Sequence, residues 1–143
     1  MQSSIHARKH LRDAELGGVI LTEFVQPPLM KVPTHRHECA TVLFTINGFA
    51  ADYIAGRTQE CRQSSLLIRP PEESHTHYYG RAGVHGLVVE IKPERYAEIS
   101  SCSAILDRVG NFQELLLAEL GLRLRELWSW IPETDLSLVN CDN

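Results

Sequence analysis

Short apolar segments separated by turn signals run through the first two thirds of the chain, and they constrain the fold more than any other feature. The segments GVILTEFV, CATVLFTI, FAADYIA, SLLIRP and VHGLVVEI are rich in β-branched and aromatic residues, which favour strands. Turn signals such as Asn47-Gly48 and the Arg-Ala-Gly run at 81–83 separate them at intervals of roughly 8 to 12 residues. This pattern predicts a mainly β fold, a sandwich or a barrel, over residues 17–92.

The sequence changes character after Lys92, where helix signals replace strand signals. Pro93 suits the first turn of a helix that covers PERYAEISS. A second helix is predicted from Phe112 to Ile131, capped by Asn111, with apolar residues three or four positions apart. These apolar residues cover more than one face, so the helix needs cover on two sides, either from a second copy or from this chain alone. We expect residues 93–143 to form a helical segment that pairs two copies as a homodimer and is truncated at its end.

The composition fits one ordinary domain. The chain has 143 residues, of which 43% are hydrophobic, and its net charge of −4 argues against a nucleic-acid surface, which is usually basic. No apolar run approaches the ~18 residues of a membrane span, and no signal peptide is recognisable, so we expect a cytoplasmic protein without membrane contact. Residues 1–16 are expected to be a solvated tail. The four cysteines form no Cys-x-x-Cys pair, which predicts reduced thiols.

Two His-x-His pairs indicate a shared binding site. His35 and His37 precede one predicted strand, and His75 and His77 lie at the start of another. Residues two apart on a strand face the same side, so each pair presents two imidazoles to one face. If the two strands are neighbours, the rings meet inside the barrel, where imidazoles suit zinc, iron or nickel. The alternative is that the rings only satisfy local hydrogen bonds.

The spacing around these histidines resembles that of the cupin superfamily of small jelly-roll barrels. The matching residues are Pro33, His35, His37, Gly48, Pro70 and His75. The resemblance implies a double-stranded β-helix barrel that binds a metal or a small molecule inside, with His35, His37 and His75 as the metal ligands. The cupin metal pattern also has a glutamate four or five residues after the second histidine, where this chain has Thr41 and Val42. That departure argues against a metalloenzyme with three histidines and one glutamate.

A longer stretch, from about residue 17 to residue 139, is similar to the N-terminal effector-sensing domain of AraC-type transcriptional regulators. The similarity is carried by PTHRHECATVLFTINGFAADYIAGR, IRPPEESHTHYYGRAGVHGLVVEIKPER and FQELLLAELGLRLRELW. In that family a cupin barrel senses a small-molecule effector, the helices after it pair subunits, and a separate helix-turn-helix domain binds DNA. The resemblance implies an effector-sensing barrel over 17–92 that makes no direct nucleic-acid contact itself.

Two functional hypotheses follow. In the first, the chain is the effector-sensing domain of an AraC-like regulator and has no catalytic residue. The pocket residues that we expect are His35, His37, Tyr53, His75 and His77. In the second, it is a stand-alone metal-dependent cupin enzyme of the dioxygenase or isomerase type, which the missing glutamate disfavours. The charged residues next to the motifs, Arg36, Arg69 and Glu73, are expected on the solvated surface.

Overall fold

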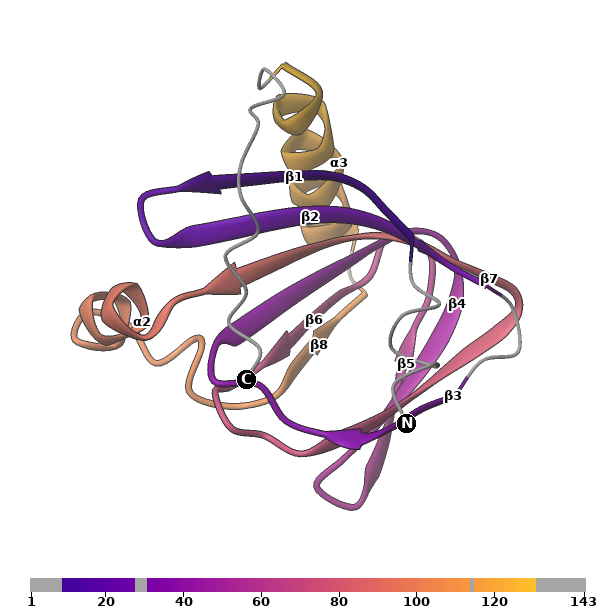
Figure 1. Cartoon of the computed structure of the whole chain (residues 1–143), viewed down its shortest axis with the longest axis horizontal. Helices are drawn as coiled ribbons and strands as arrows, with labels where there is room; N and C mark the ends of the chain where they lie inside the picture. Colours follow the sequence, from indigo (N-terminus) through magenta and orange to yellow (C-terminus); the bar gives the residue numbers. More distant parts are fainter. Residues whose placement is uncertain (1–8, 28–30, 114, 131–143) are drawn as a thin grey trace.

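The computed structural model describes residues 9–27, 31–113 and 115–130, which form a strongly bent antiparallel sheet with two helices on its outside (Figure 1). The strands are β1 (Lys9–Leu16), β2 (Val19–Gln26), β3 (Lys31–His35), β4 (Ala40–Ile54), β5 (Arg57–Cys61), β6 (Leu66–Arg69), β7 (His75–Ile91) and β8 (Gly110–Phe112). The helices are α2 (Pro93–Ser100) and α3 (Leu115–Trp130). The strand order is β1-β2-β7-β4-β6-β8, with β3 on β7 and β5 on β4. This confirms the predicted mainly β barrel followed by C-terminal helices.

Strands β4 and β7 are the long strands on which the others assemble. They pair from Ala40–Ile91 to Ile54–His75, with register shifts on both sides of Asn47-Gly48. Gly48 has a φ of +94°, and a Cβ there would lie 2.1 Å from the carbonyl oxygen of Gly83. The predicted hairpin at Asn47-Gly48 and the predicted turn at 81–83 are therefore wrong. The glycines that suggested turns instead form facing bulges in two continuous, bent strands.

The bent sheet has an inner face and an outer face, and each has its own core. The inner cluster includes Phe24, Leu43, Leu67, Val84 and Val88. The outer face packs against the helices: Trp128 of α3 contacts the cluster of Phe44 and Leu87, and Tyr96 and Ile99 of α2 pack against the cluster of Ile68 and Ile91. The helices therefore cover part of the outer face, and the inner face encloses the inner cluster.

Residues 9–16 form strand β1, although the sequence predicted a solvated tail over 1–16. The strand pairs with β2 through a turn at Gly17 and Gly18, whose φ angles are +56° and +79°. Ala14 is 2% exposed and packs in the outer cluster. The guanidinium of Arg12 lies over the Trp128 ring, 4.3 Å from its centroid. The basic residues of this segment suggested a solvated tail, but Arg12 packs on the Trp128 ring of α3, which is distant in sequence. Residues 1–8 lie outside the described residues.

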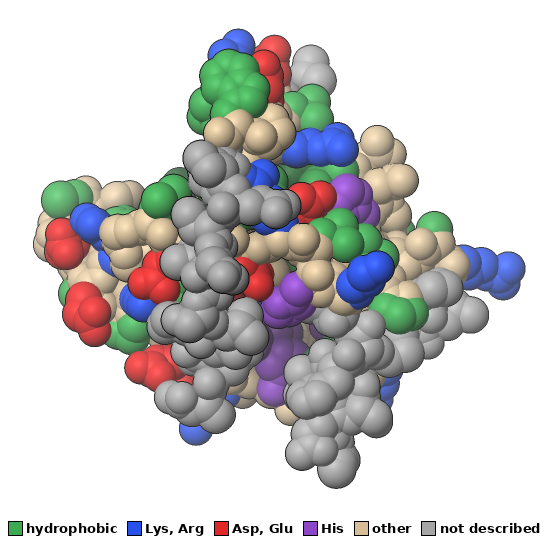
Figure 2. All heavy atoms as spheres, turned by 45° about the horizontal axis from the view of Figure 1, so that its top comes forward, with side chains coloured by type: hydrophobic (Ala, Val, Ile, Leu, Met, Phe, Trp, Pro, Cys, Tyr) green, Lys and Arg blue, Asp and Glu red, His purple; other side chains and the backbone are tan. Residues whose placement is uncertain are grey.

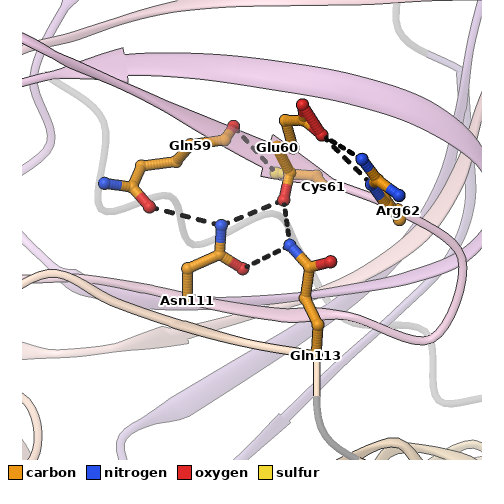
Figure 3. Close-up of polar contacts among 6 residues, drawn as sticks. All are labelled: Gln59, Glu60, Cys61, Arg62, Asn111 and Gln113. Carbon is orange, nitrogen blue, oxygen red and sulfur yellow. Dashed lines mark hydrogen bonds and ion pairs between the residues drawn. The ribbon is translucent and has the colours of Figure 1, made fainter.

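The segment before α3 is a strand that is fastened to the barrel (Figure 3). Strand β8 pairs with β6. The side-chain amide of Asn111 donates to the backbone oxygen of Glu60 at 3.0 Å and to Oε1 of Gln59 at 3.2 Å, and Gln113 donates to the same Glu60 oxygen at 3.0 Å. The prediction that Asn111 caps a helix is therefore wrong, and α3 begins at Leu115. The predicted continuation of the helical segment over 131–143 lies outside the described residues.

Candidate functional site

Three histidines meet where β3 pairs with β7. His35, the last residue of β3, is the register partner of His75, the first residue of β7, and His37 follows two residues later. The ring centroids are 4.3 Å apart for His35 and His75, 4.7 Å for His35 and His37, and 5.4 Å for His37 and His75. One ligand atom from each ring lies within 4.8 Å of the others. Figure 2 shows histidine side chains, in purple, reaching the surface near the middle of the face viewed.

Backbone carbonyls fix the orientation of two of these rings. Nδ1 of His35 lies 2.7 Å from the carbonyl oxygen of Pro33, and Nδ1 of His75 lies 3.1 Å from that of Glu73. A carbonyl oxygen only accepts hydrogen bonds, so each Nδ1 carries the hydrogen and each Nε2 keeps its lone pair. Metal-binding histidines in proteins are commonly held in this way by a backbone carbonyl or a carboxylate. The cluster therefore has the donor set and the supporting contacts of an imidazole metal site.

A group of buried charged side chains lies against His75. Nη1 of Arg69, on β6, is 2.5 Å from Nε2 of His75 and 3.3 Å from Oδ2 of Asp52, on β4. Asp52 is fully buried, and its Oδ1 contacts Nδ1 of His77. Arginine has only donors, so Nε2 of His75 accepts from it, which agrees with the tautomer set by Glu73. Asp52 is thus shared between Arg69 and His77, and Arg69 is shared between Asp52 and His75.

His75 is neutral at physiological pH. Burial lowers the pKa of its imidazole from 6.5 to about 2, and the positive charge of Arg69 acts in the same direction. The histidine of the unfolded chain takes up a proton as the pH falls below about 6.5, whereas the folded histidine does not until about pH 2. Between these values the unfolded state binds more protons, so the stability that this residue supports is lost as the pH falls.

Acidification from pH 7 to pH 5 is therefore expected to lower the free energy of unfolding by about 2 kcal/mol through His75 alone, since one extra proton in the unfolded state contributes about 1.4 kcal/mol per pH unit. Urea unfolding at both pH values, with EDTA present, measures this loss in the wild type and in His75→Gln. The variant is expected to lose about 2 kcal/mol less than the wild type. Equal losses in both proteins would contradict the assignment of a neutral His75.

Tyr53 is a predicted pocket residue that the structure places elsewhere. Its side chain is 51% exposed, while its neighbours Asp52 and Ile54 are buried, so it points out of the barrel. His77 is buried beside Asp52, and its ring centroid is 4.5 Å from that of Tyr79. The structure thus brings His35, His37, His75 and His77 to one region but not Tyr53.

The sequence did not identify two of the central residues of this region. Arg69 is 7% exposed, so the prediction that it lies on the solvated surface is wrong, and Asp52 was not singled out. A local signal existed for both. Arg69 is two residues after the buried Leu67, and Asp52 stands between Ala50 and Ile54 at alternate positions, so each shares a strand face with core residues.

Further polar groups on the inner face have no hydrogen-bond partner among the described residues. They are the hydroxyls of Thr41, Thr45 and Tyr79 and both amide atoms of Gln26. None of these side chains is more than 5% exposed. Gln26 is two residues from Phe24 on β2, and Thr41 and Thr45 are each two residues from Leu43 on β4, so they share the inner face with these cluster residues. Tyr79 itself belongs to the inner cluster. An unsatisfied buried polar group costs about 1–3 kcal/mol, so we expect polar molecules to be bound among them.

Thr41 occupies one of the positions where the cupin metal pattern has a glutamate. It is 3% exposed and lies between Arg69 of β6 and Glu90 of β7 in the register of the sheet. A hydroxyl is a much weaker metal ligand than a carboxylate, so within the described residues the metal-binding group consists of the three histidines.

Among the described residues, the cysteines supply no nucleophile in this region. Burial raises the pKa of the Cys61 thiol to about 11, with Arg69 acting in the opposite direction, so Cys61 stays protonated and unreactive. Cys102 is a free, exposed thiol, whereas Cys39 is disulfide-bonded. The prediction of reduced thiols is therefore wrong for Cys39, because the spacing of cysteines along the chain does not show which of them form disulfides.

Comparison with known proteins agrees with this fold. A family model described as an AraC-like ligand binding domain matches residues 18–137. No curated protein sequence matches the chain. Similar solved structures include a cupin superfamily protein from Desulfitobacterium hafniense, with a TM-score of 0.53 and 14% identity over 59% of this chain and 77% of that one. Another is the Cnp3 cupin domain of Schizosaccharomyces pombe, with a TM-score of 0.54 and 10% identity over 68% and 72% of the two chains.

A protein of unknown function from Rhizobium leguminosarum also matches, with a TM-score of 0.55 and 15% identity over 60% of this chain and 82% of that one. At such identities these likenesses show the fold alone, and they confirm the predicted cupin jelly roll. Bacillus subtilis oxalate decarboxylase matches at 20% identity with a TM-score of 0.48, over 54% of this chain and 22% of its own. This chain therefore spans less than a quarter of that enzyme's length.

Proposed function

The chain belongs to the family of AraC-like ligand binding domains, and from this premise we propose that it senses a small-molecule effector inside its barrel as part of a transcriptional regulator. The observation that supports this best is the set of inner-face hydroxyl and amide groups that no described residue satisfies. Folded proteins rarely keep such groups buried unless water or a ligand binds them. We therefore propose that the effector binds on the inner face among Gln26, Thr45 and Tyr79, next to His77.

The chemistry of these groups indicates the class of effector. Hydroxyl and carboxamide groups both donate and accept hydrogen bonds without carrying charge. The buried charges of Arg69 and Asp52 compensate each other across 3.3 Å. The effector that suits this lining is a small neutral molecule with several hydroxyl, carbonyl or amide groups, such as a sugar, a polyol or an aliphatic amide.

Thermal unfolding with a panel of neutral sugars, polyols and aliphatic amides tests this proposal. A compound that binds raises Tm by mass action. We expect at least one compound to stabilise the wild type, and we expect Gln26→Leu, which keeps the side-chain volume but removes both polar atoms, to lose the shift. Gln63→Leu, at an exposed glutamine, is the control and keeps it. A shift that survives in Gln26→Leu, or a panel without any effect on the wild type, would count against an effector in the barrel.

The outer side of α3 supports a homodimer. Four large apolar side chains of the helix, Leu120, Leu122, Leu127 and Trp130, are between 49% and 72% exposed. Exposed apolar patches of this kind mark interaction sites, and a second copy of the chain is the partner that we propose.

Neither helix of the described residues has the length and apolarity needed to cross a membrane. A regulator of this kind acts in the cytoplasm and leaves contact with DNA to a separate domain.

A divalent metal at His35, His37 and His75 is a second candidate function, favoured by the convergence of the three rings. Zinc, iron and nickel all accept imidazole ligands. Three protein ligands leave a coordination position open, which is the arrangement of catalytic metal sites. The alternative function, a stand-alone metal-dependent enzyme of the dioxygenase or isomerase type, rests on that open position.

A further inference from the structure

We propose that Arg69 controls metal binding by the three histidines, because its guanidinium occupies the nitrogen of His75 that a metal needs. This inference rests on the metal site proposed above. Arg69 belongs to β6 and not to either His-x-His pair, and it is not a metal ligand. It acts through His75, and its role is to set the affinity of the site.

At His75 a single nitrogen lone pair, that of Nε2, is available to both the Arg69 guanidinium and a metal ion. Nδ1 of the ring donates a hydrogen bond to the carbonyl oxygen of Glu73, so only Nε2 can bind a metal. Nη1 of Arg69 already lies 2.5 Å from Nε2. A zinc–nitrogen bond of about 2.0–2.1 Å would point along the same lone pair, so a metal displaces the guanidinium from His75.

The charge of Arg69 opposes a cation in addition to blocking it. A guanidinium does not lose its proton in proteins, and this one is 7% exposed, so little solvent screens it. Its counterion Asp52 lies 3.3 Å from Nη1, but the guanidinium, and not the carboxylate, contacts His75, so the positive end of the ion pair faces the metal site. A divalent ion at the histidines therefore binds against the positive charge of a buried neighbour.

Asp52 also gives Arg69 a partner to retain after displacement. The same Nη1 that contacts His75 is 3.3 Å from Oδ2 of Asp52, so a small movement toward the carboxylate keeps the ion pair while releasing His75. The cluster thus has a metal-free arrangement, in which Arg69 bridges His75 and Asp52, and a metal-bound arrangement, in which Arg69 keeps Asp52 and releases His75.

The affinity for Co²⁺ and Zn²⁺ tests this role. Tag-free protein is titrated with Co²⁺, followed by its visible absorption bands, and Zn²⁺ affinity is obtained by competition. Arg69→Met, which keeps an unbranched side chain but removes the charge and the donors, is expected to bind both metals at least about tenfold more tightly than the wild type, the loss of a hydrogen bond from a charged group being of that size. Arg62→Met is the matched control, since Arg62 pairs with Glu60 on the surface, and it keeps wild-type affinity.

A second variant keeps the test decisive if Arg69→Met folds poorly. Arg69→Met/Asp52→Asn removes both buried charges and is expected to show the same gain in affinity, which His75→Ala in either background abolishes. If the wild type and the Arg69 variants bind metal equally, the metal site stands and the role of Arg69 is overturned. If none of the proteins binds metal, the metal site and the role of Arg69 are both overturned.

Discussion

Replacing Asp52 by alanine is expected to lower the free energy of unfolding by about 3–5 kcal/mol, because it removes the buried carboxylate that pairs with the buried guanidinium of Arg69. Asp52 is fully buried, and its two oxygens contact Arg69 and His77. Removing one partner of a buried ion pair exposes the full desolvation cost of the other, whereas removing both partners does not. The double variant Asp52→Leu/Arg69→Met is therefore expected to recover most of the lost stability.

Urea unfolding of the wild type, the Asp52 variant and the double variant measures these differences. The surface pair of Glu60 and Arg62 provides a matched control, since its side chains are 43% and 63% exposed. Glu60→Ala is expected to cost less than about 1 kcal/mol, as exposed ion pairs contribute little. A loss below about 1 kcal/mol in Asp52→Ala, or a double variant less stable than the single one, would show that Arg69 does not depend on Asp52.

The strand pattern predicted the class of fold, but it could not predict where strands bend. A glycine at positive φ is compatible with a tight turn and equally with a bulge inside a strand. At Gly48 the choice depends on Gly83, which lies opposite on β7 and is distant in sequence. Two expected hairpins therefore became two long bent strands, β4 and β7.

The same bulges explain why Tyr53 points out of the barrel, although strand alternation predicts that it faces inward. Before the bulge of β4 the inner-face residues have odd numbers, such as Thr41 and Leu43, and after it they have even numbers, such as Asp52 and Ile54. Alternation without a bulge would put Tyr53 on the inner face. His75 and His77 lie at the start of β7, before its bulge, so they keep the spacing of two that gives them a shared face. His37 lies after the end of β3, outside any strand, and still contacts the His35 ring.

Arg69 and Asp52 show the limit of composition-based expectations for charged residues. Arginine and aspartate are mostly exposed in proteins unless they are paired. Here each is paired with a residue from another strand, Arg69 of β6 with Asp52 of β4. Pairing across the barrel cannot be read from either segment alone, although alternation with core residues indicates that both face inward.

Trp128 is expected to be the side chain that holds α3 on the barrel, and Trp128→Ala should cost about 3–5 kcal/mol. The indole is 3% exposed and packs with Phe44 and Leu87, and its Nε1 donates to Oε1 of Glu23 at 3.2 Å. The helix approaches closely at this point, since a Cβ on Gly121 would lie 2.2 Å from the Phe44 ring. Trp128→Phe, which keeps most of the packing and loses the donor, should cost about 1–2 kcal/mol.

Replacing Trp130, two residues further along the same helix, tests the proposed dimer independently of the docking of α3 on the barrel. It is 72% exposed, so Trp130→Ala should change the stability of a dilute monomer by less than about 0.5 kcal/mol but weaken the proposed homodimer. Denaturant unfolding at low protein concentration measures the first effect, and sedimentation velocity over a concentration series measures the second. If Trp128→Ala were as stable as the wild type, α3 would not be docked through this side chain. If Trp130→Ala sedimented like the wild type at every concentration, the exposed side of α3 would not be the dimer interface.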